Sequence, residues 1–380
     1  MQAAPEPSSP SPRARFALVV SLWGLAVSYV TLTVLIIALP TIARDLAAPM
    51  ASTNWVTIAP MLSVAAFTPL AGGLADRIGA KPVWLGGLAL TLLGILGSAL
   101  APDLPTLIVS RFVSGVGSAL FTPAALAITS ALYPPHARAT PIGYWTSTVA
   151  IAPLVGVIVG GYVTELWGWR TLFYAQLALG IPALLAGLSL PHQRAQHGRT
   201  FDLAGSLMAA LAAAGLLCVF SSVGDLRLTV PLTVLATGAL AVIERRAVAP
   251  IFPPALLARP MVRQALLSRF ALGFTYMGSC MIVPYLLGSL WGQSPSAVAL
   301  TLAVRPLAMG LVGAWAGRLA RRYGNAGPTI VGAWLVFLSC IAFALLGVER
   351  TLQDQLWLGF GLIAAGIGIG IGSPGPMAAV

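Results

Sequence analysis

Long apolar runs separated by short polar segments make up almost the whole chain. The runs are continuous rather than alternating, and most are long enough to cross the hydrocarbon core of a bilayer as a helix. Only helices and closed barrels satisfy the backbone in lipid, and continuous runs are typical of helices. About twelve runs are found, near residues 16–39, 54–75, 83–101, 104–132, 140–164, 170–190, 203–223, 228–243, 264–290, 296–317, 327–347 and 356–380. The pattern predicts an all-α integral membrane protein, a bundle of about twelve transmembrane helices.

The composition agrees with a lipid environment. Of the 380 residues, 58% are hydrophobic and only 8% are charged, whereas soluble domains carry about 25% charged residues. The formal net charge of +11 could indicate a nucleic-acid partner. The basic residues lie in short loops between apolar runs, however, so we expect the lipid bilayer as the partner and no nucleic acid.

The distribution of Lys and Arg predicts the orientation. If the N-terminus is cytoplasmic, fourteen Lys and Arg residues fall on cytoplasmic segments and four on outside loops. This is the bias of the positive-inside rule. Residues 1–15 are rich in Pro and Ser, which predicts a disordered cytoplasmic tail. A signal peptide is the alternative, but the run at 16–39 exceeds a signal's apolar region. We therefore expect a multi-pass protein of the plasma membrane.

A short charged turn occurs twice in the chain. The segment Gly72 to Val83 reads GGLADRIGAKPV between two apolar runs, and Gly317 to Gly324 reads GRLARRYG. Charges are costly in hydrocarbon, so each turn should lie at a water interface. Glycine adopts positive φ readily, so Gly79 can end the connection. The turns share five positions: Gly72, Leu74, Ala75, Arg77 and Gly79 match Gly317, Leu319, Ala320, Arg322 and Gly324. The match indicates an internal repeat.

The repeat divides the apolar runs into groups. If both turns mark equivalent points of two six-helix bundles, the first bundle covers 16–190 and two extra linker helices lie at 191–262. The remaining segment, 263–380, holds four helices of a second bundle. The sequence thus predicts a C-terminally truncated chain, with twelve helices of an expected fourteen.

Polar and small residues mark two of the runs. Arg111, Ser114, Gly115, Ser118 and Thr122 share one face of a helix. A cation at mid-membrane costs about 2.5–3.5 kcal/mol, so this face suggests a water-filled cavity. The alternative is that Arg111 extends toward the interface.

A second helix carries a stripe of small residues, Thr148, Ala152, Gly156, Gly160 and Thr164, at a spacing of four. Such a stripe allows close helix packing. Pro153 should bend the helix nearby. A third site is left open, because Arg305, next to Pro306, could bind carbonyls freed by that proline or face the cavity.

Several motifs together resemble one family. They are GGLADRIGAK at 72–81, LIVSRFVSG at 107–115, GVIVGG at 156–161, ALPTIARDL at 38–46, WRTLFYAQLALG at 169–180 and FDLAG at 201–205. In this combination the chain resembles the major facilitator superfamily, specifically its fourteen-helix drug/proton antiporter branch. The resemblance implies alternating-access efflux of amphipathic small molecules, drugs or secondary metabolites, coupled to protons. We also expect no cofactor or metal, and a monomer.

The resemblance assigns roles to particular residues. The expected cytoplasmic gate consists of Asp76, Arg77, Lys81, Gly72 and Gly79. Arg111 takes the place of the proton-linked arginine, with Arg305 as a second cavity charge. Helix packing and gating are expected of Gly115, Pro153, Gly156, Gly160 and Gly161. Polar, aromatic and Met positions inside the runs are candidates for the substrate cavity: Ser28, Thr31, Thr33, Met61, Phe121, Trp145, Tyr276, Met277 and Tyr285. For Asp76, simple topological anchoring is the alternative.

Two other functions stay open. Thr31 stands where the branch usually has an acidic residue, which favours a passive or differently coupled metabolite facilitator. A membrane-embedded enzyme is less favoured, because the chain has no HExxH or P-loop pattern. Its three histidines, His136, His192 and His197, all lie in predicted cytoplasmic loops. We therefore expect a transporter and not an enzyme.

Overall fold

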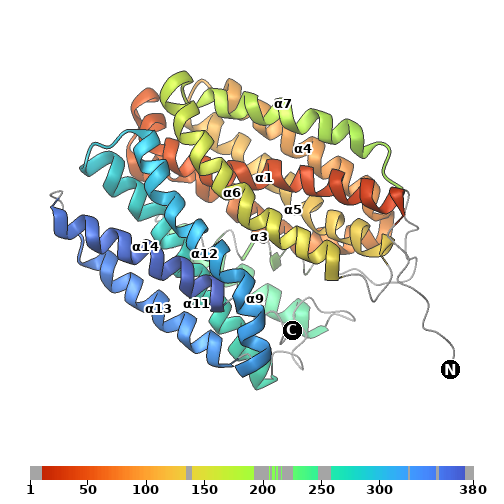
Figure 1. The fold of residues 1–380 in the computed structure, drawn as a ribbon. Coiled ribbons are helices and arrows are strands. Elements are labelled where there is room, and N and C mark those ends of the chain that lie inside the picture. The colour runs from red at the N-terminus through yellow and green to blue at the C-terminus, as the bar shows by residue number, and fades with distance from the viewer. Residues whose placement is uncertain are drawn as a thin grey trace. The chain divides into compact units, whose positions relative to one another are not determined.

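The computed structural model describes residues 11–133, 139–191, 226–246, 258–323, 326–347 and 351–372, with single positions between 205 and 215. All regular structure in these residues is helical (Figure 1). The elements are α1 (Pro12–Asp45), α2 (Met50–Thr53), α3 (Trp55–Ile78), α4 (Ala80–Leu100), α5 (Leu104–Leu132), α6 (Ala139–Trp167), α7 (Arg170–Gly187), α9 (Leu226–Arg246), α11 (Pro260–Tyr285), η2 (Leu286–Leu290), α12 (Pro295–Tyr323), α13 (Ala326–Ala344) and α14 (Leu352–Gly372). The prediction of an all-α architecture is confirmed for the described residues.

Six stretches of these helices are long and apolar enough to cross a membrane: Pro12–Val30, Ala80–Leu100, Leu104–Thr129, Pro295–Val312, Gly327–Ala344 and Leu352–Ile371. The total of twelve spans stays a prediction. Helix α9 is longer than the apolar run at 228–243, because it continues through Glu244 to Arg246. Backbone hydrogen bonds carry a helix past the end of its apolar stretch, so hydropathy alone underestimated its length.

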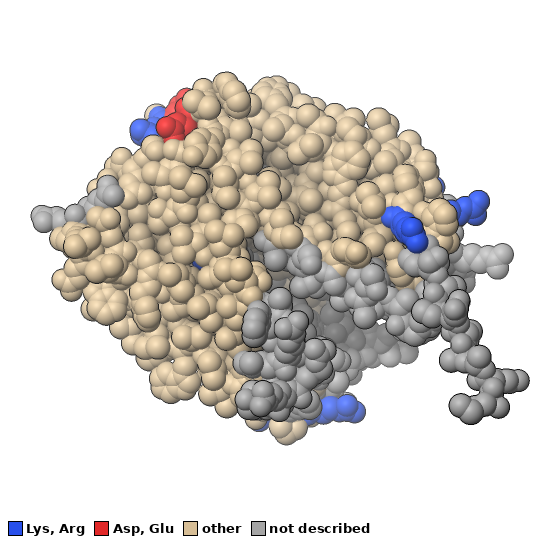
Figure 2. Space-filling model, in the orientation of Figure 1, with Lys and Arg blue, Asp and Glu red and all other residues tan. Residues whose placement is uncertain are grey.

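Charged side chains are few on the face drawn in Figure 2, and uncharged residues cover most of its described surface. Large apolar side chains are exposed on several helices, among them Phe270 at 71% and Leu311 at 74%. Exposed apolar patches of this kind are unusual on soluble proteins, and lipid is the solvent that they suit.

The described chain forms two packed units, which we treat separately. One unit comprises Met1–Ser28, Ile58–Val149 and Tyr174–Ile251. The other comprises Tyr29–Thr57, Ala150–Phe173 and Phe252–Val380. Four of the dividing points fall inside helices, in α1, α3, α6 and α7, so different stretches of one helix belong to different packing groups.

In the first unit, α4 and α5 lie side by side (Figure 1). Glycines allow the close approach, because a Cβ on Gly87 or Gly94 would collide with the α5 backbone. Trp84 of α4 is fully buried and packs edge-to-face on Phe121 at a centroid distance of 6.2 Å. Gly187, at the end of α7, lies directly against the Trp84 ring. The core of this unit therefore joins α4, α5 and α7 around one indole.

In the second unit, α14 packs against both α12 and α13. A buried cluster extends from α14 to α6 and includes Val157, Leu287, Val298 and Leu362. Burying each such side chain contributes on the order of 1.5–3 kcal/mol in water, but much less between helices in lipid. Close packing of small and branched residues is therefore the main source of cohesion here.

Candidate functional site

The turn between α3 and α4 has the backbone that the sequence predicted. Gly79 adopts φ 93° between the two helices. Asp76 is half-buried and Arg77 is exposed. Lys81 Nζ donates a hydrogen bond to the carbonyl oxygen of Leu188 at 2.7 Å, just beyond the end of α7. A cation at a helix C-terminus is favourable, so Lys81 fastens α7 to the start of α4. The fifth residue of the predicted gate, Gly72, lies within α3.

Arg111 lies on α5 with only 3% of its surface exposed. Its carbonyl oxygen accepts a hydrogen bond from Ser114 Oγ at 2.7 Å. The neighbouring positions on this face contact other helices, because Gly94 of α4 reaches Ser114 and Gly115 reaches Ser63 of α3. Ser63 Oγ also donates to the Phe112 carbonyl oxygen at 2.9 Å. Much of the face that the sequence suggested as a cavity wall is therefore helix packing.

Arg305 is the second buried cation, with 5% of its surface exposed. Its Nη1 donates a hydrogen bond to Ser279 Oγ of α11 at 2.6 Å. Gly366 of α14 packs directly on the Arg305 carbonyl oxygen. A charge-assisted hydrogen bond to a hydroxyl offsets part of the cost of burying the guanidinium.

The side of α6 that carries Val157 and Gly161 packs against α12. A Cβ on Gly161 would overlap the Ala299 side chain and the Pro295 carbonyl oxygen. Val157 joins the buried cluster around Val298, also on α12. Of the small-residue stripe itself, Ala152, Gly156, Gly160 and Thr164 are buried and Thr148 is half-buried. Pro153 lies inside the helix and is half-buried. The sequence predicted the close packing here but not its partner.

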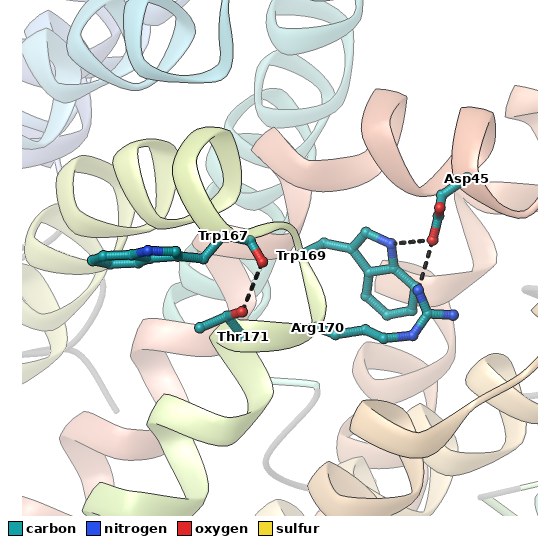
Figure 3. Close-up of polar contacts among 5 residues, drawn as sticks. All are labelled: Asp45, Trp167, Trp169, Arg170 and Thr171. Atoms are coloured by element: carbon teal, nitrogen blue, oxygen red, sulfur yellow. Dashed lines mark hydrogen bonds and ion pairs between the residues drawn. The ribbon is translucent and has the colours of Figure 1, made fainter.

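An acidic residue that the sequence did not single out joins α1 to the start of α7 (Figure 3). Asp45 Oδ2 accepts hydrogen bonds from Trp169 Nε1 at 3.0 Å and from Arg170 Nη1 at 2.6 Å. The Arg170 guanidinium also lies 4.1 Å from the Trp169 ring centroid. Hydrogen bonds from Arg170 and Trp169 lower the pKa of Asp45 from its ordinary value.

Trp169 lies at the end of a predicted span, where tryptophans often anchor a helix at the membrane interface. Only 2% of its surface is exposed, however. Its indole is instead held by Asp45 and by an edge contact with Phe173 at 6.0 Å. Trp167 is 67% exposed, as an interfacial side chain would be. Its carbonyl oxygen accepts a hydrogen bond from Thr171 Oγ1 at 2.8 Å. This bond links the end of α6 to the first turn of α7.

The cavity candidates have mixed surroundings. Phe121 is fully buried against Trp84, so the structure places it in helix packing and not on a cavity surface. Ser28 is also buried, Met61 and Trp145 are half-buried, and Tyr285 is 41% exposed. The side chains of Thr31, Thr33, Tyr276 and Met277 lie outside the described residues.

A comparison with known families settles the class of this fold. The family model described as Major Facilitator Superfamily matches residues 22–380. The chain belongs to the Major Facilitator Superfamily. The solved structure of a POT family transporter in complex with a thioalcohol-conjugated peptide has the same fold, with a TM-score of 0.71 and 16% sequence identity. That likeness covers 96% of this chain and 83% of the other.

Curated relatives of this superfamily member include two resistance proteins. The methylenomycin A resistance protein of Streptomyces coelicolor is 29% identical over 368 residues, covering 94% of this chain and 76% of the relative. The tetracenomycin C resistance and export protein of Streptomyces glaucescens is 29% identical over 353 residues, covering 88% of this chain and 65% of the relative. The chain thus spans roughly two thirds to three quarters of their lengths. The Major Facilitator Superfamily is a superfamily of transporters, so this chain is a transporter and not an enzyme.

Proposed function

We propose that this chain exports amphipathic small molecules, antibiotics among them, from the cytoplasm across the plasma membrane. The observation that carries the proposal is the similarity to two antibiotic resistance proteins over most of the chain. The mechanism is alternating access, in which two helix bundles rock around a central site. The bundles of the proposal are 16–190 and 263–380, joined by linker helices at 191–262, with the N-terminus in the cytoplasm.

The close packing of α6 on α12 supports this mechanism. The two helices belong to different bundles in the proposed division, and Gly161 lets them touch backbone to side chain. Under the positive-inside orientation this contact lies at the outer side of the membrane, where it closes the exit path. The predicted packing residues, Gly115 of α5 and Pro153, Gly156, Gly160 and Gly161 of α6, then serve packing within and between bundles.

The charged turn between α3 and α4 supplies the gate on the cytoplasmic side. Asp76 and Arg77 act there, while Lys81 holds the turn to α7 through Leu188. Gly72 and Gly79 give the turn its shape. Replacing Asp76 with Asn should impair transport and change its dependence on pH. Unchanged transport would indicate that Asp76 only anchors the turn at the membrane surface and does not act as a gate.

The buried charges suggest the cargo. Arg111 and Arg305 are buried cations, and the described helices carry their acidic residues near their ends. A cavity near these cations favours neutral or anionic amphipathic molecules over cationic ones. Inverted vesicles should therefore accumulate an anionic fluorescent dye. Uptake of a cationic dye without uptake of the anionic one would contradict this preference.

Proton coupling is the driving force that we propose, with Arg111 in the proton-linked position. Thr31, where the branch usually has an acid, favours the second candidate, a passive facilitator. Cargo-induced proton efflux from acidified inverted vesicles separates the two. An antiporter releases protons when cargo is added, and Arg111→Leu should lower that release to about a tenth or less. Transport without any proton movement would identify a facilitator.

Drug susceptibility provides the direct test of export. Expression in a bacterium that lacks its main efflux pumps should raise the inhibitory concentration of an amphipathic antibiotic several-fold. Gly161→Val should abolish this resistance, because its side chain would overlap Ala299. The matched control is Gly238→Val, on α9, where an added Cβ meets nothing within 4 Å. Resistance that Gly161→Val leaves intact would contradict the proposed role of α6.

A further inference from the structure

The end of α6 contacts the first turn of α12 through a carboxylate. Glu165 Oε2 accepts a hydrogen bond from the backbone N–H of Ser296 at 3.1 Å. From the α12 side, Ser294 Oγ accepts the N–H of Ala297 at 3.4 Å and shares a 3.0 Å hydrogen bond with Ser296 Oγ. The first N–H groups of a helix have no partner within it, and the helix dipole favours a negative charge there. Glu165 therefore caps α12 from another helix.

The contact beneath this carboxylate is closely packed. Thr164, its neighbour on α6, is 3% exposed, and Ala299 of α12 is fully buried. Gly161, one turn before Glu165, lies against Ala299 and Pro295. The carboxylate itself is exposed at the rim of this contact. Glu165 therefore lies next to the buried residues by which α6 and α12 pack.

Two other acidic residues cap helices, but each does so locally. Asp103 Oδ1 accepts the N–H of Thr106 on its own helix α5 at 2.9 Å. Asp354 Oδ2 accepts the N–H of Thr351 at 3.2 Å at the start of α14. Glu165 and Ser296 are 131 positions apart in the chain. Of these three caps, only the Glu165 contact breaks when α6 and α12 separate.

We propose that Glu165 is the latch of the outer gate, a positioning residue that favours the state in which α6 and α12 are closed. The proposal rests on the alternating-access function above. In the closed state the carboxylate neutralises the exposed N-terminus of α12, and in the open state that favourable interaction is lost. A ligand-free transporter should thus spend more time closed at this end with Glu165 than without it.

Cysteine labelling can measure this bias directly. Thr164→Cys places a thiol of similar size in the buried contact, in a chain whose own Cys218, Cys280 and Cys340 are replaced by Ala. A membrane-impermeant maleimide is then added outside intact cells. Glu165→Gln, which keeps the shape but removes the charge, should speed labelling about two- to fivefold. Glu165→Lys should speed it further because it places a cation at the α12 N-terminus, and Glu165→Asp should restore slow labelling in part.

Asp103→Asn is the matched control, because it removes the charge from a helix cap that joins no second helix. It should leave the labelling rate of Cys at position 164 unchanged. Equal rates in the Glu, Gln and Lys forms would overturn the latch, as would equal acceleration by Asp103→Asn. A variant that loses helicity by circular dichroism is replaced by Glu165→Ala, to which the same criteria apply. Labelling needs no cargo, so failure of export with a Glu165-dependent rate would overturn only the proposed function.

Discussion

Two sets of three helices in this transporter cross in the same way, although they lie far apart in the chain. In the first trio, α3, α4 and α5, a Cβ on Gly117 would meet the Gly87 carbonyl oxygen and the Thr91 nitrogen. In the second trio, α12, α13 and α14, a Cβ on Gly368 would meet the same two atoms of Gly332 and Val336. Gly332 follows Gly87 by 245 positions, and Val336 follows Thr91 by the same interval. The repeat seen in the charged turns thus extends to the helix contacts.

The remaining contacts of the trios keep the same intervals. Gly115 packs on the Pro60 carbonyl oxygen, and Gly366 packs on that of Arg305, again 245 positions after Pro60. Asp354 follows Asp103 by 251 positions, the interval that also separates Gly368 from Gly117, but the two caps differ in geometry. Asp103 accepts the N–H of Thr106 from ahead of it, whereas Asp354 accepts the N–H of Thr351 from behind it. The close glycine contacts are therefore the part of the repeat that a common scaffold requires.

The differences between the trios concern charge. Arg111 of α5 corresponds to Leu362 of α14, which is 1% exposed, whereas Arg305 of α12 corresponds to Pro60 of α3. Among the described side chains, each trio thus buries one cation, but on a different helix. Because the scaffold contacts match and the cations do not, the cations are the better candidates for function.

The trios also differ in what covers them. Leu88 and Leu92 of α4 are buried, and Gly180 of α7 lies against Leu92. Their counterparts on α13 are Ala333 and Phe337, both exposed in the described structure. With Ile330 and Trp334 they line an apolar pocket of about 340 Å³. Equivalent faces therefore have different neighbours, so covering helices contribute to burial in one trio and not in the other.

The largest expected effect comes from a substitution that disrupts the helix packing of the first trio. Gly87→Leu should prevent α4 from approaching α5, because even a Cβ at Gly87 would overlap the Phe121 backbone. Overpacking of this kind costs about 1–3 kcal/mol or more. Gly86→Leu, one residue earlier, is the control, since an added Cβ there meets nothing within 4 Å. Yield of monodisperse protein and its melting temperature measure the difference. Equal behaviour of the two variants would show that the α4–α5 crossing is not as close as described.

The structural features that local sequence patterns determine could be predicted. Continuous apolar runs predicted the helices, and the turn at Gly79 predicted its positive φ. The small residues of α6 predicted close packing, but nothing in the sequence identified α12 as the partner. Partner choice depends on how bundles pack, and contacts such as Glu165 with Ser296 join residues 131 positions apart. Phe121 was misjudged for the same reason, because periodicity does not show that Trp84 fills the space beside it.

A smaller effect is expected at two positions with positive φ that correspond in the two copies of the repeat. Ala47 adopts φ 47°, and Gly292, 245 positions later, adopts φ 62°. A left-handed conformation costs a non-glycine residue about 1–2 kcal/mol. Gly292→Ala should therefore destabilise the protein by about 1 kcal/mol. Ala47→Gly should gain up to about 1 kcal/mol, because relief of strain exceeds the added entropy of the unfolded chain. Thermal unfolding of both variants measures the two effects, and effects of the same sign would argue against equivalent turns.

The smallest effect is expected at a charged residue that has an uncharged counterpart in the second copy of the repeat. Asp45 binds Arg170, whereas its counterpart 245 positions later is Leu290, an exposed apolar residue. The Asp45 and Arg170 side chains are 48% and 38% exposed, so water screens the pair and Asp45→Asn should cost less than about 1 kcal/mol at neutral pH.

The pH dependence of this cost follows from the direction of the shift. Hydrogen bonds from Arg170 and Trp169 hold the pKa of Asp45 below its ordinary value of 3.8. The unfolded chain therefore takes up the proton first as the pH falls, and the contribution of Asp45 is present above about pH 4 and lost below it. Melting temperatures of the parent and of Asp45→Asn, measured from pH 7 to pH 3, should converge at the acidic end. A gap that stays constant over this range would mean that the Asp45 charge does not stabilise the α1–α7 contact.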